Sequence, residues 1–295
     1  MINGTAEKLR FGGFSGIEYI NNEIWVISDR AKKADIEEDE SSYVFILDTN
    51  YNFQHSFKFY DVKNAESIRF DKLTKNYFYA FEEKLETGVG YVDSYSKEPH
   101  KIITEKINLL NRGIEALTFS KDSSLWVAFE SGTNPKCEGM TTTPFYKIPF
   151  DKQKFTYNDS LKIIYEYPID RCECLNYDPN IHQDFDGNLG NGVTEILAFP
   201  NDPNKMLVLE RCYNKKIVSA IYLAEISVSS KSIQKTKIFD FNDAKNFSKT
   251  NFRPDNLEGM TWGSNNKGEN LIYLITDNNF SKAQNSQLIK LVIRK

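Results

Sequence analysis

Acidic residues recur at fixed places in short apolar segments of this 295-residue chain. Glu115 stands inside the apolar run 114–119, and Glu130 directly follows the apolar run 125–129. The four polar residues 121–124 lie between the two runs, which is typical of a tight antiparallel hairpin. Both runs are apolar on both faces, as in strands that other protein covers on both sides. Carboxylates in such a hairpin must face a shared polar site inside the fold.

The same hairpin occurs five times, at residues 12–30, 64–83, 111–131, 191–211 and 256–278. An early position in the five copies holds Ser15, Glu66, Glu115, Glu195 and Glu258. A late position holds Asp29, Glu82, Glu130, Glu210 and Asp277. Because nine of these ten residues are carboxylates, the repeat predicts an inner acidic ring and a second acidic ring beside it.

Further strand-like runs between the hairpins give four strands to each of the first four units and three to the fifth. Residues 6–11 are predicted to supply the missing strand by pairing with residues 287–293. Radial repetition of four-stranded sheets defines a β-propeller. We therefore predict an all-β, five-bladed propeller, one domain over residues 1–295, closed by pairing of its N- and C-terminal strands. Six blades, the sixth within 171–190, and a two-sheet sandwich are the alternatives.

The first strand of each blade lines the central channel, so Glu66, Glu115, Glu195 and Glu258 are expected to converge there. Carboxylates about 6 Å apart repel by roughly 2 to 3 kcal/mol per pair at an effective dielectric near 20. Protonation or a bound cation must relieve this repulsion. Hard oxygen ligands without a converging histidine or cysteine predict Ca²⁺, or Mg²⁺, as the cofactor. The alternative is that the glutamates lock the blades together by accepting backbone N–H groups or by pairing with arginines.

Arginines lie in or near the repeated motifs, at positions 30, 69, 112, 211 and 253. Because guanidinium is the usual bidentate partner of phosphate oxygens, Arg30, Arg112 and Arg211 are predicted to bind phosphate or substrate. Residues 184–195 have the acidic spacing of an EF-hand loop, but Leu189 takes the place of the required glycine and no helical pattern flanks it. This loop is expected at most to add oxygen ligands at one mouth of the channel.

Several ordered motifs resemble the phytase-like β-propeller family, described as having the esterase-like activity of phytase. They are GGFSGI (12–17), SDR (28–30), NRGIEAL (111–117), GVTEI (192–196), LER (209–211), NLEGM (256–260) and DNNF (277–280). The resemblance implies a propeller and a phosphoric-ester hydrolase, often in exported bacterial proteins. Related calcium-dependent phytases have six blades, against the five counted here. Asp29 and Arg30 carry a fainter similarity to five-bladed, calcium-dependent nucleotidases of the apyrase type.

Composition excludes several classes of protein. A net charge of −4 without a basic stripe argues against nucleic acid as a partner. No apolar stretch approaches the roughly 18 residues of a membrane span. With three histidines and no Gly-x-Ser-x-Gly motif, a Ser-His-Asp hydrolase is not expected. The four cysteines, at 137, 172, 174 and 212, are compatible with disulfides, and frequent export in the family predicts at least one.

The sequence thus predicts a cation-binding propeller that hydrolyses a small-molecule phosphate ester or related ester. A non-catalytic binding propeller with a structural central metal remains open, as does a lactonase- or apyrase-like calcium-dependent hydrolase. Export to the periplasm or the extracellular space, with a leader peptide outside this sequence, is expected, and a cytoplasmic location is the alternative. The catalytic residues and the oligomeric state are not predicted.

Overall fold

The computed structural model describes residues 9–32, 38–106, 113–130, 141–169, 191–214, 216–243, 252–264 and 270–293. These ranges consist mainly of β-strands and contain no α-helix, only one 3₁₀ turn at Asp159–Leu161. None of the described segments is a helix that could cross a membrane. The prediction of an all-β protein is confirmed, as expected for a chain rich in Phe, Tyr and Ile.

The first two sheets each contain four antiparallel strands. The first has the order β1 (Phe14–Ile20), β2 (Glu23–Ser28), β5 (Ser41–Asp48) and β6 (Phe53–Lys63). The second has the order β7 (Ala65–Phe70), β8 (Tyr77–Glu83), β9 (Glu86–Val92) and β10 (Pro99–Lys106). In both sheets, strands that follow one another in the chain are neighbours, the meander expected of a propeller blade.

The next two units share one eight-stranded sheet. One half contains β11 (Ile114–Phe119), β12 (Leu125–Phe129), β13 (Thr141–Ile148) and β16 (Ile163–Ile169). The other half contains β17 (Asn191–Phe199), β18 (Asp202–Asn214), β19 (Lys216–Ser227) and β20 (Ser232–Asp240). The halves meet through β16 and β20, which pair in parallel at Glu166 and Ser232.

The last sheet has three strands, β21 (Asn256–Ser264), β22 (Asn270–Asp277) and β23 (Leu288–Val292). Two small ribbons complete the described structure. They pair β3 (Ala31–Lys32) with β4 (Glu38–Asp39), and β14 (Phe150–Asp151) with β15 (Thr156–Tyr157).

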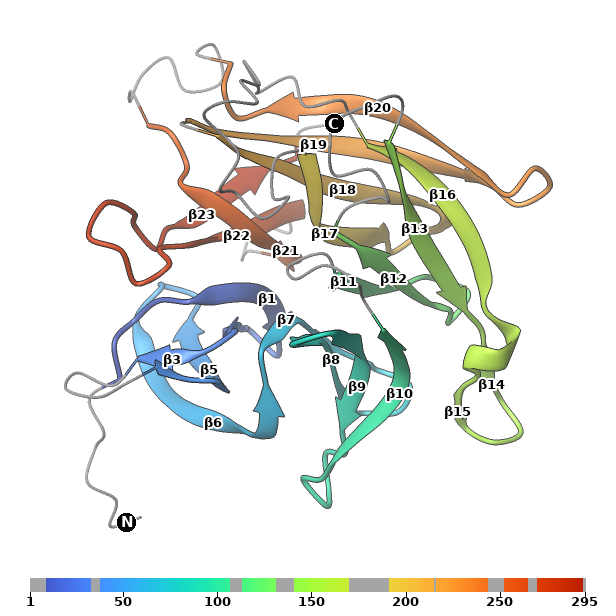
Figure 1. Ribbon diagram of the computed structural model, residues 1–295, viewed down its shortest axis with the longest axis horizontal. Helices are drawn as coiled ribbons and strands as arrows, with labels where there is room; N and C mark the ends of the chain where they lie inside the picture. Colours follow the sequence, from blue (N-terminus) through green and yellow to red (C-terminus); the bar gives the residue numbers. More distant parts are fainter. Residues whose placement is uncertain are drawn as a thin grey trace.

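The first strand of each hairpin lies near the centre of the molecule (Figure 1). Going round, β1 contacts β7, β7 contacts β11, β11 contacts β17, β17 contacts β21, and β21 contacts β1, which closes a ring. The core lies between successive sheets, where buried side chains of one sheet pack on those of the next. Ile27 and Val44 of the first sheet, for example, pack with Ile68 and Tyr79 of the second. This radial arrangement is that of a β-propeller.

The predicted pairing of residues 6–11 with 287–293 is not seen in the part of that segment the structure describes, which begins at Leu9. The Arg10 N–H donates instead to the Lys32 carbonyl at 2.9 Å, while β23 pairs only with β22. The ends of the ring meet through the inner strands. The Phe14 N–H donates to Asp277 Oδ1 at 3.1 Å, so a side chain closes the junction that strand pairing was expected to close.

Candidate functional site

Each of the five inner hairpins has a β-bulge at the same place. In the hairpin of β11 and β12, Ile114 pairs with Phe129 and Ala116 pairs with Ala128, so Glu115 has no cross-strand partner. The residues skipped in this way are Ser15, Glu66, Glu115, Thr194 and Glu258. A bulge re-aims the side chain of the extra residue. The early position of the repeat is therefore a bulge position.

The bulges correct the sequence alignment of the fourth hairpin by one residue. Val193 pairs with Glu210 and Glu195 pairs with Leu209, so the bulged residue is Thr194. Glu195 corresponds to Gly16, Ser67, Ala116 and Gly259 of the other hairpins. By the same register, Arg211 and not Glu210 occupies the late position. Matching carboxylate to carboxylate places Glu195 beside Glu115, whereas the cross-strand pairs place Thr194 there.

Glu195 and Glu210 accordingly lie outside the two acidic rings. Glu195 Oε2 lies 2.8 Å from Arg69 Nη2 and its side chain is fully buried. Burial raises the pKa of Glu195 to about 8, although the Arg69 guanidinium lowers it. Glu210 accepts a hydrogen bond from the Tyr167 hydroxyl at 2.7 Å and lies 2.5 Å from Lys235 Nζ. Glu195 and Glu210 both agree with the alternative expected from sequence, in which glutamates hold the blades together.

Seven carboxylates remain in the two rings and influence each other electrostatically. We call them the acidic cluster: Glu66, Glu115, Glu258, Asp29, Glu82, Glu130 and Asp277. Burial raises the pKa of Glu66 well above its usual value, and the charges of Asp29 and Glu82 raise it further. Burial and the charge of Glu66 do the same for the pKa of Glu115. The cluster therefore favours a bound proton or cation.

Glu66 and Glu115 differ from the other members because neither has a hydrogen-bond or ion-pair partner among the described residues. Both residues retain some exposed surface. They belong to neighbouring inner strands, β7 and β11, which contact each other. Among the described residues, the repulsion between these two carboxylates is therefore not relieved by a protein counter-charge of their own.

Members of the late ring also connect consecutive sheets. Glu82 Oε2 accepts the Gly113 N–H at 2.7 Å, and Asp277 Oδ1 accepts the Phe14 N–H at 3.1 Å. A Cβ atom at position 113 would lie 2.5 Å from Glu82 Oε2 and 2.5 Å from Thr87 Oγ1, so only glycine permits this approach. These carboxylates have a structural role of their own, whatever ligand the cluster binds.

Arg211 supplies a positive charge inside the cluster. Its Nη1 donates to Glu258 Oε1 and to Asn256 Oδ1, and its Nη2 lies 3.4 Å from Glu130 Oε1. Burial raises the pKa of Glu258 to about 8 against the lowering effect of Arg211. The guanidinium is thus directed at protein acceptors.

The other two predicted phosphate ligands are placed differently. Arg30 Nη1 lies 3.0 Å from Asp29 Oδ2, and its guanidinium lies 5.9 Å from the centroid of the Phe280 ring. The Arg30 side chain is 31% exposed, which places it at the solvent side of the cluster. Arg112 lies outside the described residues, as does 184–190 of the EF-hand-like stretch.

The donor set of the cluster suits calcium or magnesium by its chemistry, because all seven side chains offer hard carboxylate oxygens. Its geometry is less complete. Within the described ranges, no group of three or more His, Cys, Asp or Glu side chains is arranged to hold a metal ion. The residues fit a cation by type and charge, and further ligands would come from water or substrate.

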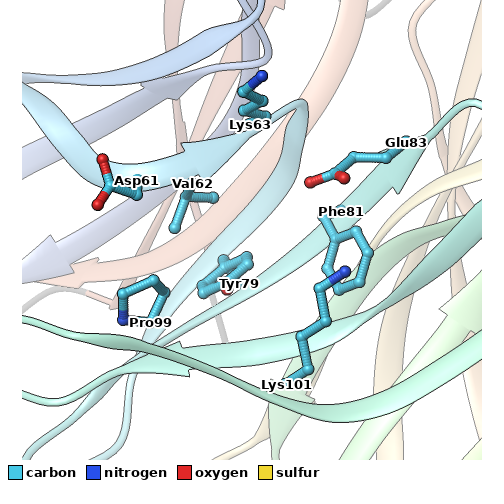
Figure 2. Close-up of a pocket in the computed structure, with 8 residues that line it drawn as sticks. All are labelled: Asp61, Val62, Lys63, Tyr79, Phe81, Glu83, Pro99 and Lys101. Atoms are coloured by element: carbon cyan, nitrogen blue, oxygen red, sulfur yellow. The ribbon is translucent and has the colours of Figure 1, made fainter.

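A separate pocket of about 100 Å³ lies between β6, β8 and β10 (Figure 2). Its charged rim includes Glu83 and Lys101, and Tyr79 and Phe81 line its apolar part. Lys101 Nζ already lies 2.5 Å from Glu86 Oε1 and 4.5 Å from the centroid of the Phe81 ring. This pocket contains no member of the acidic cluster.

Cys212, on β18, is disulfide-bonded. This confirms the prediction of at least one disulfide. Positions 137, 172 and 174 all lie outside the described residues.

The fold is that of a β-propeller with an acidic cluster on its inner strands, and sequence comparison identifies the family. The model of the phytase-like family, described as esterase-like activity of phytase, matches residues 9–280. Because this match spans most of the chain, the protein belongs to the phytase-like family, which confirms the resemblance seen in the motifs. No curated protein matches the chain at a significant level.

Solved structures with a similar fold have very different sequences. A thermostable family-43 glycoside hydrolase has 9% identity and a TM-score of 0.57, with 97% of this chain and 91% of that chain covered. An endo-1,4-beta-xylanase from Bacteroides thetaiotaomicron has 8% identity, a TM-score of 0.54 and coverage of 98% and 97%. An endo-arabinase from the same organism has 11% identity, a TM-score of 0.51 and coverage of 98% and 96%. These propeller-type neighbours support the fold alone.

Proposed function

We propose that this protein is a calcium-dependent hydrolase of small phosphoric esters built on a five-bladed propeller, with Mg²⁺ as the alternative cation. Glu66, Glu115 and Glu258 would hold the cation, and Arg30 would bind the phosphate group of the substrate. Membership of the phytase-like family supports the reaction class. The disulfide at Cys212 supports export, because structural disulfides persist in oxidising compartments.

The observation that carries the proposal is that the bulge position holds a hydroxyl residue in two blades and a glutamate in three. Ser15 Oγ donates to the Ala65 carbonyl at 2.5 Å, and Thr194 Oγ1 donates to the Leu257 carbonyl at 3.2 Å. In both cases the acceptor is the residue before the bulge of the next blade. An ionised carboxylate has no proton to donate. At the other three bulges the chain therefore has a carboxyl group in place of the hydroxyl that bonds to the next blade, which supports a ligand-binding role for the glutamates.

A bound divalent cation polarises phosphoryl oxygens and lowers the pKa of bound water. Glu66 and Glu115 would supply the charge that retains the cation. Arg30, at the solvent side, would orient the phosphate through its N–H groups. We assign Arg211 as an internal counter-ion that keeps Glu258 and Glu130 in place, in preference to the substrate-binding role expected from sequence.

A non-catalytic propeller with a structural cation is the second candidate. The late ring supports it, since Glu82 and Asp277 are bound to backbone N–H groups and Arg211 to protein acceptors. In this case the cation would stabilise the ring without an open coordination position.

Hydrolysis assays with calcium and with chelator distinguish these candidates. The substrates would be inositol hexakisphosphate, p-nitrophenyl phosphate, a nucleoside diphosphate, an aryl acetate and a lactone. We expect calcium-dependent release of phosphate that falls at least tenfold in Glu66→Gln and Glu115→Gln. Release from the nucleotide alone, or lactone opening alone, would identify the apyrase- or lactonase-like alternative. Calcium binding without turnover of any substrate would support the non-catalytic propeller with a structural cation.

A further inference from the structure

The Arg69 guanidinium lies at the centre of the ring of inner strands. Its side chain is 4% exposed. Nη1 donates to the carbonyls of Ile17 and Ile68 at 2.8 Å each, and Nη2 donates to Met260 at 2.9 Å and Ile196 at 3.3 Å. These carbonyls, which we call the carbonyl ring, occupy the same repeat position on β1, β7, β21 and β17. A single group reaches four inner strands only if it lies on the channel axis.

Two carboxylates also lie against the Arg69 guanidinium. Arg69 Nη2 lies 2.8 Å from Glu195 Oε2, and Nη1 lies 3.6 Å from Glu18 Oε2. Glu18 is itself held by the Thr261 hydroxyl at 3.0 Å and the Phe70 N–H at 3.4 Å. A buried group of carbonyl and carboxylate oxygens is stable only when hydrogen-bond donors or a cation satisfy it. Arg69 supplies both.

The residues at the same repeat position in the other blades show that Arg69 departs from the repeat. The residues equivalent to Arg69 are Glu18, Thr118, Leu197 and Thr261. Thr118 Oγ1 accepts the Ala198 N–H of the next blade at 3.1 Å, and Thr261 Oγ1 accepts the Tyr19 N–H at 3.3 Å. Arg69 has no acceptor atom and reaches across the channel to Glu195 on β17. Strand β11 lies between β7 and β17 in the ring, so this contact joins blades that are not neighbours.

We propose that the carbonyl ring, with Glu195 and Glu18, is a second cation site of the channel, specific for a guanidinium group, which the chain fills with its own Arg69. Arg69 lies three residues beyond the bulge of its strand, about 10 Å at the rise of a β-strand. The tethered cation therefore occupies the axis of the ring next to the acidic cluster.

Chemical rescue of Arg69→Ala tests the site. The variant should melt well below the wild type, and methylguanidinium should raise its melting temperature in a saturable manner. Methylurea, which has a similar shape and no charge, should give no such rise, and neither ligand should stabilise the wild type or the exposed-surface control Arg253→Ala. Arg69→Lys, whose ammonium fills the site, should melt between the wild type and Arg69→Ala and should not respond to methylguanidinium.

If Arg69→Ala does not fold alone, the readout is its refolding yield with methylguanidinium compared with methylurea. Recovery with methylguanidinium only supports the site. Equal effects of both compounds, no recovery with either, or an Arg69→Ala variant that melts like the wild type would overturn the proposal.

Discussion

Glutamates at one repeat position have different surroundings. Glu258 contacts the Arg211 guanidinium, whereas Glu66 and Glu115 have no partner among the described residues. The difference arises because the late position holds an arginine in the fourth hairpin and carboxylates in the other four. We therefore expect a cation, if the cluster binds one as proposed, to lie closest to Glu66 and Glu115.

Glu115→Gln should weaken calcium binding without harming the calcium-free protein. A ligand that binds only the folded state stabilises it by about 2.7 kcal/mol at a hundredfold excess over Kd. Calcium should raise the melting temperature of the wild type, and the rise should shrink in Glu115→Gln. In chelator the variant should melt at the same or a higher temperature, because repulsion by Glu66 falls. Glu225→Gln, an exposed change on β19, is the matched control. Equal melting of the wild type with calcium and chelator would contradict the prediction.

Stability in chelator should depend on pH through Glu195. The pKa of Glu195 rises from 4.5 to about 8 on folding, so the folded state binds the proton more tightly. Between these pH values the unfolded chain binds fewer protons, and the free energy of unfolding falls as pH rises. Melting curves from pH 4.5 to 8 should show this decline for the wild type. The decline should be smaller in Glu195→Gln, and an unchanged slope would show that Glu195 does not titrate in this range.

At the scale of the strands, Gly113→Ala tests the connection between β8 and β11. The added Cβ atom would lie 2.5 Å from Glu82 Oε2 and from Thr87 Oγ1, both of which are buried acceptors of backbone N–H groups. We expect a loss of about 1 to 3 kcal/mol in the free energy of unfolding, the usual cost of overpacking, measured in urea. Because Glu82→Ala removes one of the clashes, Gly113→Ala should cost less in that background. An equal cost in both backgrounds would place the strain elsewhere.

The five hairpins could be predicted from sequence because apolar runs, polar turns and acidic residues repeat with them. The position of the fourth copy could not, because residue type placed Glu195 beside Glu115, and only the pairing of Val193 with Glu210 shows that the bulge is Thr194. The sequence places Arg69 among the arginines that could pair with glutamates. Its four carbonyl acceptors, however, belong to strands that lie far apart in the chain. Spacing within one hairpin does not contain that information.

At the scale of the whole molecule, the disulfide at Cys212 should contribute to stability. Such cross-links typically stabilise by about 2 to 4 kcal/mol, mainly by restricting the unfolded chain. The melting temperature should fall when the protein is reduced, and Cys212→Ser should show a smaller difference between oxidised and reduced samples. Thiol titration of the unreduced, denatured protein should find fewer than four free thiols. Four would contradict the disulfide.

The parallel contact between β16 and β20, at Glu166 and Ser232, joins the outer strands of two neighbouring four-stranded units. Within the described strands, the outermost positions left without a pairing strand are β6, β10 and β23. An uncovered edge is a template on which another copy of a protein can add a strand and begin to aggregate. Each of these strands carries exposed lysines, namely Lys58 and Lys63, Lys101 and Lys106, and Lys290. Strand addition would bring these ammonium groups against a second copy, so the charges that decorate the rim also oppose self-association of the propeller.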